Sequence, residues 1–152
     1  MTASLSEDIA SGFKVVVDCN PDDSGPAFVR MRARDRTRSI EERDLTLREA
    51  VQAYRRGPRT VWGPVILEVL APAIMVRLVI YEELPPVINL EDLRQQLVVE
   101  VLDAAAHVPL PDNARYIKQR IMRQAAKRMT RWLRREIRAA GWRGPNFEDL
   151  PS

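Results

Sequence analysis

The sequence contains few of the residues that support disulfide, metal or histidine chemistry. It has one cysteine, Cys19, and one histidine, His107, in 152 residues. A disulfide framework and a zinc or His-rich metal site are therefore excluded, and a reducing compartment is expected. Glycine-rich phosphate loops, the H-E-x-x-H zinc motif and the G-x-S-x-G nucleophile motif are also missing from the sequence. We therefore expect no enzymatic activity, no metal and no cofactor.

Long hydrophobic runs are missing as well. No apolar run reaches 18 residues, which predicts that no segment spans a membrane. Residues 1–8 lack the basic-then-apolar order of a secretory signal. Hydrophobic residues make up 45% of the chain and charged residues 30%, a globular composition at the size of one domain. Together these features predict a soluble, cytoplasmic protein without a membrane partner.

The positive charge is concentrated in one part of the sequence. The whole chain has 24 Lys and Arg against 21 Asp and Glu, for a net charge of +3. Residues 112–143 alone contain 11 basic and 2 acidic residues, so the rest of the chain is net negative. Such an uneven distribution predicts an acidic partner for the basic segment.

The first 43 residues differ from the rest and predict a small β-hairpin. The β-branched residues of Phe13–Val17 favour one strand, residues 20–26 favour a turn, and Phe28–Arg38 favours a second strand. In the second strand, alternate positions are arginines that would share one face: Arg30, Arg32, Arg34, Arg36 and Arg38. This face is either solvated and protects a sheet edge, or it contacts phosphates or an acidic partner.

From Asp44 onward the apolar spacing predicts helices, so we expect a mainly α fold with four or five helices. Thr46 and Glu49 fit a capping box at the start of the first of these helices, and Gly57 ends it. A second, more apolar helix covers residues 61–81, where Pro72 is expected to break or kink it.

Two further helices follow. Asn89 is expected to cap the third helix, and Asp112 or Asn113 to cap a long last helix that ends at Gly141. The apolar stripe of the last helix comprises Ile117, Ile121, Ala125, Met129 and Trp132. Its basic stripe comprises Arg120, Arg123, Lys127, Arg131, Arg134 and Arg138. Like charges three or four positions apart repel, which favours contact with a polyanion over a merely solvated face.

The order of these helices resembles region 2 of bacterial RNA polymerase sigma factors, in the sigma-70-like superfamily. The resemblance lies in LREAVQAYRRG at 47–57, VLAP at 69–72, EDLRQQ at 91–96, and the basic segment 114–136. It divides the chain into an N-terminal extension (1–43), a region 2-like domain (44–141) and a tail (142–152). Because only the tail follows Gly141, we expect the C-terminal helix-turn-helix domain of complete sigma factors to be absent.

The resemblance implies a transcription initiation factor that binds core RNA polymerase and the promoter −10 region. In this family the third helix docks on the clamp helices of the largest polymerase subunit, which implies roles for Asp92, Gln95 and Gln96. The resemblance also implies promoter DNA contacts by the start and basic face of the last helix: Arg115, Tyr116, Arg120, Arg123, Lys127, Arg131, Arg134 and Arg138. Tyr116 and Trp132 are the aromatic candidates for stacking on unpaired bases, although Trp132 also fits the core.

Two alternatives remain open at the level of the sequence. The chain could be a protein-interaction regulator with a region 2-like fold that no longer recognises promoters and binds a regulatory protein. It could also bind nucleic acid without polymerase, with the arginines at 30–38 joining the basic helix. A steep loss of affinity with salt would separate phosphate binding from binding to a protein.

Overall fold

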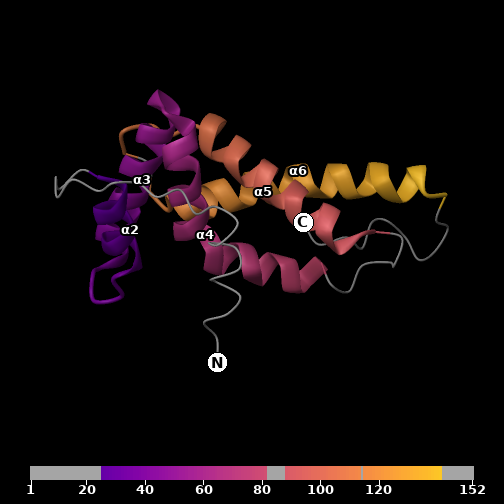
Figure 1. Cartoon of the computed structure of the whole chain (residues 1–152), viewed down its shortest axis with the longest axis horizontal. Helices are drawn as coiled ribbons and strands as arrows, with labels where there is room; N and C mark the ends of the chain where they lie inside the picture. The colour runs from indigo at the N-terminus through magenta and orange to yellow at the C-terminus, as the bar shows by residue number, and fades with distance from the viewer. Residues whose placement is uncertain (1–24, 82–87, 114, 142–152) are drawn as a thin grey trace.

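The computed structural model describes residues 25–81, 88–113 and 115–141 (Figure 1). Within these ranges the chain forms helices and no strand, which confirms the mainly α class. The helices are α2 (Pro26–Arg34), α3 (Ile40–Arg56), α4 (Arg59–Tyr81), α5 (Leu90–His107) and α6 (Ile117–Ala139). α2 packs on α3 and α4, α3 packs on α4, and α5 lies along α6.

The predicted second strand of the hairpin is wrong, because α2 occupies most of it. Pro26 opens this helix at a position where its missing N–H is not needed. Val29 is buried against the other helices, 3% exposed. Arg30 pairs with Glu68 of α4 at 2.8 Å, and the Arg32 guanidinium lies 3.9 Å from the Glu49 carboxylate of α3. The alternating arginines therefore do not form a single free face, and the predicted first strand lies outside the described residues.

α3 begins earlier than the sequence pattern predicts. Ser39 caps it, because the Ser39 hydroxyl accepts the Glu42 N–H at 3.2 Å. The predicted capping role of Thr46 is wrong: this side chain is buried, and its hydroxyl donates to the Glu42 carbonyl at 2.9 Å. Gly57 ends the helix at a φ of 86°, a conformation that favours glycine. The predicted domain boundary between residues 43 and 44 falls inside α3.

α4 is a continuous helix through the centre of the fold. Pro72 lies inside it and does not end it. Of the two predicted effects of Pro72, a break or a kink, the break is therefore wrong. By length and composition α4 could cross a membrane, a test that the core helix of a soluble protein also passes. In this fold, one side of α4 is buried against α2, α3 and α5. Its buried residues are Gly63, Val65, Ile66, Leu67, Leu70, Ala71, Ile74 and Tyr81.

α5 and α6 pack side by side and complete the core (Figure 1). The prediction that Asn89 caps α5 is confirmed, because its side-chain oxygen accepts the N–H groups of Glu91 and Asp92 at 2.8 and 3.3 Å. The side chains that α5 buries are Leu93, Leu97, Val101, Ala104 and Ala105. They belong to the hydrophobic core, and their burial stabilises the packing of α5 on α3, α4 and α6.

Candidate functional site

The apolar and basic stripes of α6 lie on opposite sides of the helix, as predicted. Ile117, Ile121, Ala125 and Met129 are fully buried, and Trp132 is half-buried against the core. The six basic residues are all exposed: Arg120, Arg123, Lys127, Arg131, Arg134 and Arg138. At 3.6 residues per turn they share an arc of about 80° and extend for roughly 27 Å. We call these six residues the basic face.

The basic face is not neutralised from within the described part of the chain. None of its six members forms an ion pair with a described carboxylate, and the only α6 cation that does is Arg128. Arg120 donates its Nε–H to the Arg115 backbone carbonyl at 2.9 Å. The single acidic residue of α6, Glu136, is exposed on a different side of the helix. The positive charge of this face is therefore available to a partner.

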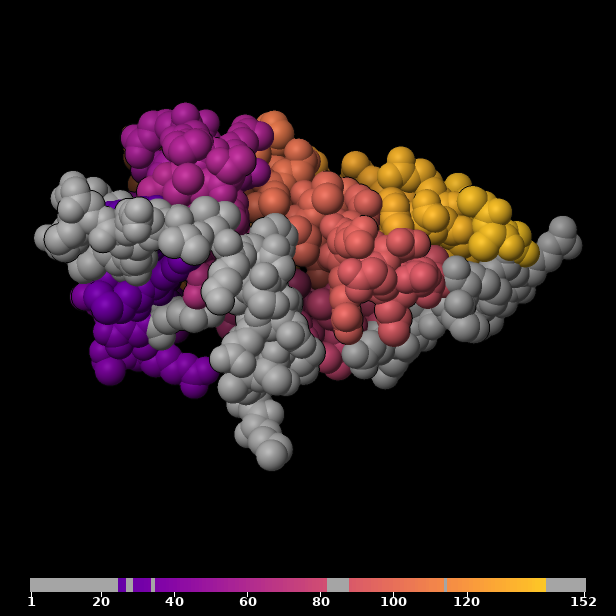
Figure 2. All heavy atoms as spheres, in the orientation of Figure 1, coloured from indigo at the N-terminus to yellow at the C-terminus, as the bar shows by residue number. Residues whose placement is uncertain are grey.

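Arg128 differs from the basic face although it belongs to the same helix. Its guanidinium forms an ion pair with Asp103 of α5, and Nη1 lies 3.9 Å from a Glu100 oxygen. α5 and α6 lie beside each other at the surface (Figure 2). The carboxylates of α5 therefore neutralise the side of α6 that they contact and leave the basic face open.

The start of α6 is built by α3. The Asp44 carboxylate accepts the N–H groups of Tyr116 at 3.0 Å and of Ile117 at 2.6 Å. The prediction that Asp112 or Asn113 caps this helix is therefore wrong. Tyr116 precedes the helix at φ 58° and ψ 48°, with its side chain 61% exposed.

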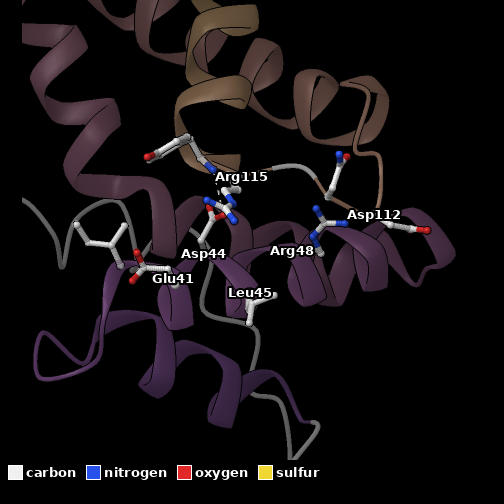
Figure 3. Close-up of a pocket in the computed structure, with 9 residues that line it drawn as sticks. Glu41, Asp44, Leu45, Arg48, Asp112 and Arg115 are labelled. Carbon is white, nitrogen blue, oxygen red and sulfur yellow. Dashed lines mark hydrogen bonds between the residues drawn. The ribbon is translucent and has the colours of Figure 1, made fainter.

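A hollow of about 570 Å³ lies between α3 and the segment that leads into α6 (Figure 3). Its lining residues are Ile40, Glu41, Asp44, Leu45, Arg48, Asp112, Asn113, Arg115 and Tyr116. Arg115 and Tyr116, both predicted contact residues, are exposed here beside the first turn of the basic helix. The sequence pattern did not indicate Asp44 or Arg48, because their partners are far away in the chain.

Two arginines of α3 hold the same connecting segment. Arg48 donates from Nη2 to the Pro111 carbonyl at 2.9 Å. Arg55 donates from Nε to the Ala105 carbonyl at 3.0 Å and from Nη2 to the Val108 carbonyl. Burial lowers the pKa of the Arg55 guanidinium. These bonds satisfy carbonyl groups at and beyond the end of α5, where helical partners are missing.

The residues predicted to bind polymerase do not form one equivalent set. Asp92 and Gln95 are exposed on α5, and the Gln95 side chain donates to Glu91 at 3.4 Å. Gln96 is half-buried and donates to the Glu100 side chain at 2.9 Å. Val99, which the sequence pattern did not indicate, is 55% exposed. It lies four and seven positions after Gln95 and Asp92, so it shares their face, which we call the α5 face.

No protein-family model, curated protein or solved structure matches this chain. Among the described residues, no group of three or more His, Cys, Asp or Glu side chains could hold a metal ion. The arrangement instead offers two surfaces for macromolecules: the basic face of α6 and the partly apolar α5 face.

Proposed function

We propose that the protein binds nucleic acid through the basic face of α6 and acts as a sigma-like transcription initiation factor on core RNA polymerase. The observation that carries the proposal is the basic face itself. Its six cations lie in one row opposite a buried apolar stripe, of which Trp132 alone is partly exposed, and they form no ion pair with a described carboxylate. Neighbouring cations in the row repel one another, and a polyanion would relieve that repulsion.

The chemistry of the row suits phosphate. Five of its six members are arginines, whose planar guanidinium groups can bind phosphate oxygens in pairs. Neutralising phosphates releases bound counterions, so affinity for DNA should fall steeply with salt. The buried stripe fixes α6 against α5, which holds the row straight for the roughly 27 Å that the contact would cover.

Two further features support the sigma-like part of the proposal. The order of α3 to α6 follows the segments in which the sequence resembles sigma region 2. The α5 face combines the exposed polar groups of Asp92 and Gln95 with the exposed Val99 side chain, a composition suited to a protein interface. Tyr116, exposed at the start of the basic helix, could stack on an unpaired base.

The test is the salt dependence of binding to a fluorescently labelled promoter-like DNA duplex, followed by anisotropy between roughly 50 and 200 mM salt. Replacing Arg123, Lys127 and Arg131 with alanine removes three potential phosphate contacts. The slope of log affinity against log salt should then flatten by up to about 2.7. Unchanged affinity in a triple variant of native helix content would overturn the proposal.

A matched pair of single variants controls for overall charge. Arg131→Gln and Arg128→Gln each remove one positive charge from α6. Arg131 is exposed on the basic face, whereas Arg128 is paired with carboxylates of α5. We expect Arg131→Gln to flatten the salt slope by about 0.9 and Arg128→Gln to leave the slope unchanged. Equal effects would mean that net charge, and not the basic face, determines binding.

A further inference from the structure

We infer that Asp44 is a positioning residue, which fixes the start of the basic helix before nucleic acid binds. Its carboxylate lies on α3 and accepts two N–H groups at the beginning of α6, those of Tyr116 and Ile117. The inference rests on the proposed function, because it concerns how the basic face is presented to its ligand.

α6 has no described cap of its own. The first N–H groups of a helix lack partners within the helix and need an external acceptor. Tyr116, the residue at the cap position, provides no side-chain hydrogen bond. Asp44, 73 positions away from Ile117 in sequence, supplies both oxygens instead. A carboxylate at this end is also favoured by the helix dipole.

The backbone at Tyr116 is in the left-handed region. Its φ of 58° is uncommon for a residue with a side chain and persists where the surroundings enforce it. The Asp44 carboxylate accepts the N–H of this same residue, so the bond holds the conformation that directs the chain into α6. Figure 3 shows Asp44 and Arg115 together at this turn.

α3 holds the connecting segment at several points. Arg48 follows Asp44 by one helical turn and bonds the Pro111 carbonyl, while Arg55, two turns later, bonds the Val108 carbonyl. α3 thus contacts the connector at Val108, Pro111 and Tyr116 along one of its sides. Asp44 is the last of these contacts before the basic face begins.

A positioning role and a purely electrostatic role of Asp44 predict opposite changes in affinity for a polyanion when its carboxylate is removed. Asp44 carries a negative charge beside a basic helix, so its removal should raise affinity for a polyanion if charge alone mattered. Positioning predicts that Asp44→Ala lowers affinity instead, because the first turn of α6 loses its cap. Asp44→Asn keeps one acceptor oxygen and should fall between the alanine variant and the wild type.

The experiment compares Asp44→Ala with Glu41→Ala, a variant that removes the same charge from the same hollow. Glu41 is exposed, and it forms no hydrogen bond with the described part of the connector. Amide hydrogen exchange is measured on the free full-length protein, and anisotropy is measured with the same labelled duplex. In Asp44→Ala we expect exchange at residues 116–120 to accelerate about threefold to thirtyfold, with several-fold weaker DNA binding at an unchanged salt slope.

The outcomes separate this inference from the proposed function. Unchanged exchange in Asp44→Ala, or affinity that rises as in Glu41→Ala, would overturn the positioning role. Circular dichroism and thermal melting establish that the variant is folded, and Asp44→Asn serves as the milder variant if the alanine change unfolds the chain. If the wild type itself fails to bind DNA, the proposed function is overturned, and the exchange data alone decide whether Asp44 holds the start of α6.

Discussion

Arg128 of α6 forms an ion pair with Asp103 of α5, and this contact separates one arginine of a basic helix from its neighbours. The Arg128 guanidinium also lies 3.9 Å from Glu100, whose side chain is only 14% exposed. The basic residues of α6 thus lie in two different environments. Arg128 fastens α6 to α5, whereas the basic face points away from α5 and is free to meet a partner.

We expect Arg128→Ala to lower the free energy of unfolding by about 1 kcal/mol, because the variant loses an ion pair and leaves two carboxylates close together. Arg134→Ala, on the exposed basic face, should change it by less than about 0.5 kcal/mol. Urea denaturation at low and high salt measures both values. The difference should shrink at high salt as the charges are screened, and equal effects would contradict the role of Arg128.

The α5 face is the surface through which we expect the protein to bind polymerase. We expect the wild type to co-elute with bacterial core RNA polymerase on a sizing column, and Val99→Asp to lose this co-elution by placing a charge in the middle of the face. Gln95→Ala should weaken co-elution more than Gln96→Ala, because the Gln95 side chain is exposed whereas the Gln96 side chain is half-buried. Arg94→Ala, on another side of α5, is the control.

Failure of the folded wild type to co-elute would contradict the polymerase part of the proposed function. If DNA binding with a steep salt slope were still observed, the protein would be a nucleic-acid binder that acts without polymerase. If neither partner were bound, the results would favour the alternative hypothesis that the protein is a regulator that binds other proteins. The co-elution and anisotropy experiments therefore test separate surfaces.

Because the Tyr81 hydroxyl is buried, we expect the protein to lose stability at alkaline pH. Tyr81 is 1% exposed, and its hydroxyl finds no hydrogen-bond partner among the described residues. Burial raises the pKa of Tyr81 above its ordinary value of 10.0. Between these two pKa values the unfolded chain holds fewer protons than the folded one, so stability should fall as pH rises above about 10.

Tyr81→Phe should remove this alkaline loss. Near neutral pH the variant should be as stable as the wild type or up to about 1 kcal/mol more stable. Folding of the wild type removes an unpaired hydroxyl group from water, and the phenylalanine variant avoids this cost. Chemical denaturation at several pH values measures the effect, and tyrosinate absorbance should show Tyr81 ionising above the ordinary tyrosine pKa of 10.0. A substantial loss of stability of Tyr81→Phe at neutral pH would contradict this prediction, because it would mean that the Tyr81 hydroxyl makes a stabilising hydrogen bond.

Two neighbouring positions on α5 test the packing of the core. Leu97 is fully buried, whereas Val99 is 55% exposed on the other side of the helix. Leu97→Ala should lower the free energy of unfolding by about 2–5 kcal/mol, because it leaves a cavity between α5 and its neighbours. Val99→Ala should change it by less than about 0.5 kcal/mol. Thermal or urea unfolding of both variants measures the two changes in the free energy of unfolding. Similar losses at the two positions would contradict this prediction.

The sequence by itself determined the features that depend on residues a few positions apart. The spacing of Ile117, Ile121, Ala125 and Met129 predicted the buried side of α6, and all four are fully buried. Asn89 was predicted correctly as a cap because its hydrogen bonds reach only two and three positions along the chain. The exposed basic face follows from the same helical period.

Only the tertiary structure decided the features that join distant parts of the chain. Alternating arginines at 30–38 suggested a strand over residues 28–38, but residues 28–34 belong to helix α2, whose Val29 packs into the core and whose Arg30 pairs with Glu68. The cap of α6 comes from Asp44, not from the acidic or amide residues that directly precede the helix. Capping and ion pairing require only that an acceptor lie near a donor in space, and packing of α3 against the other helices is what brings that acceptor there.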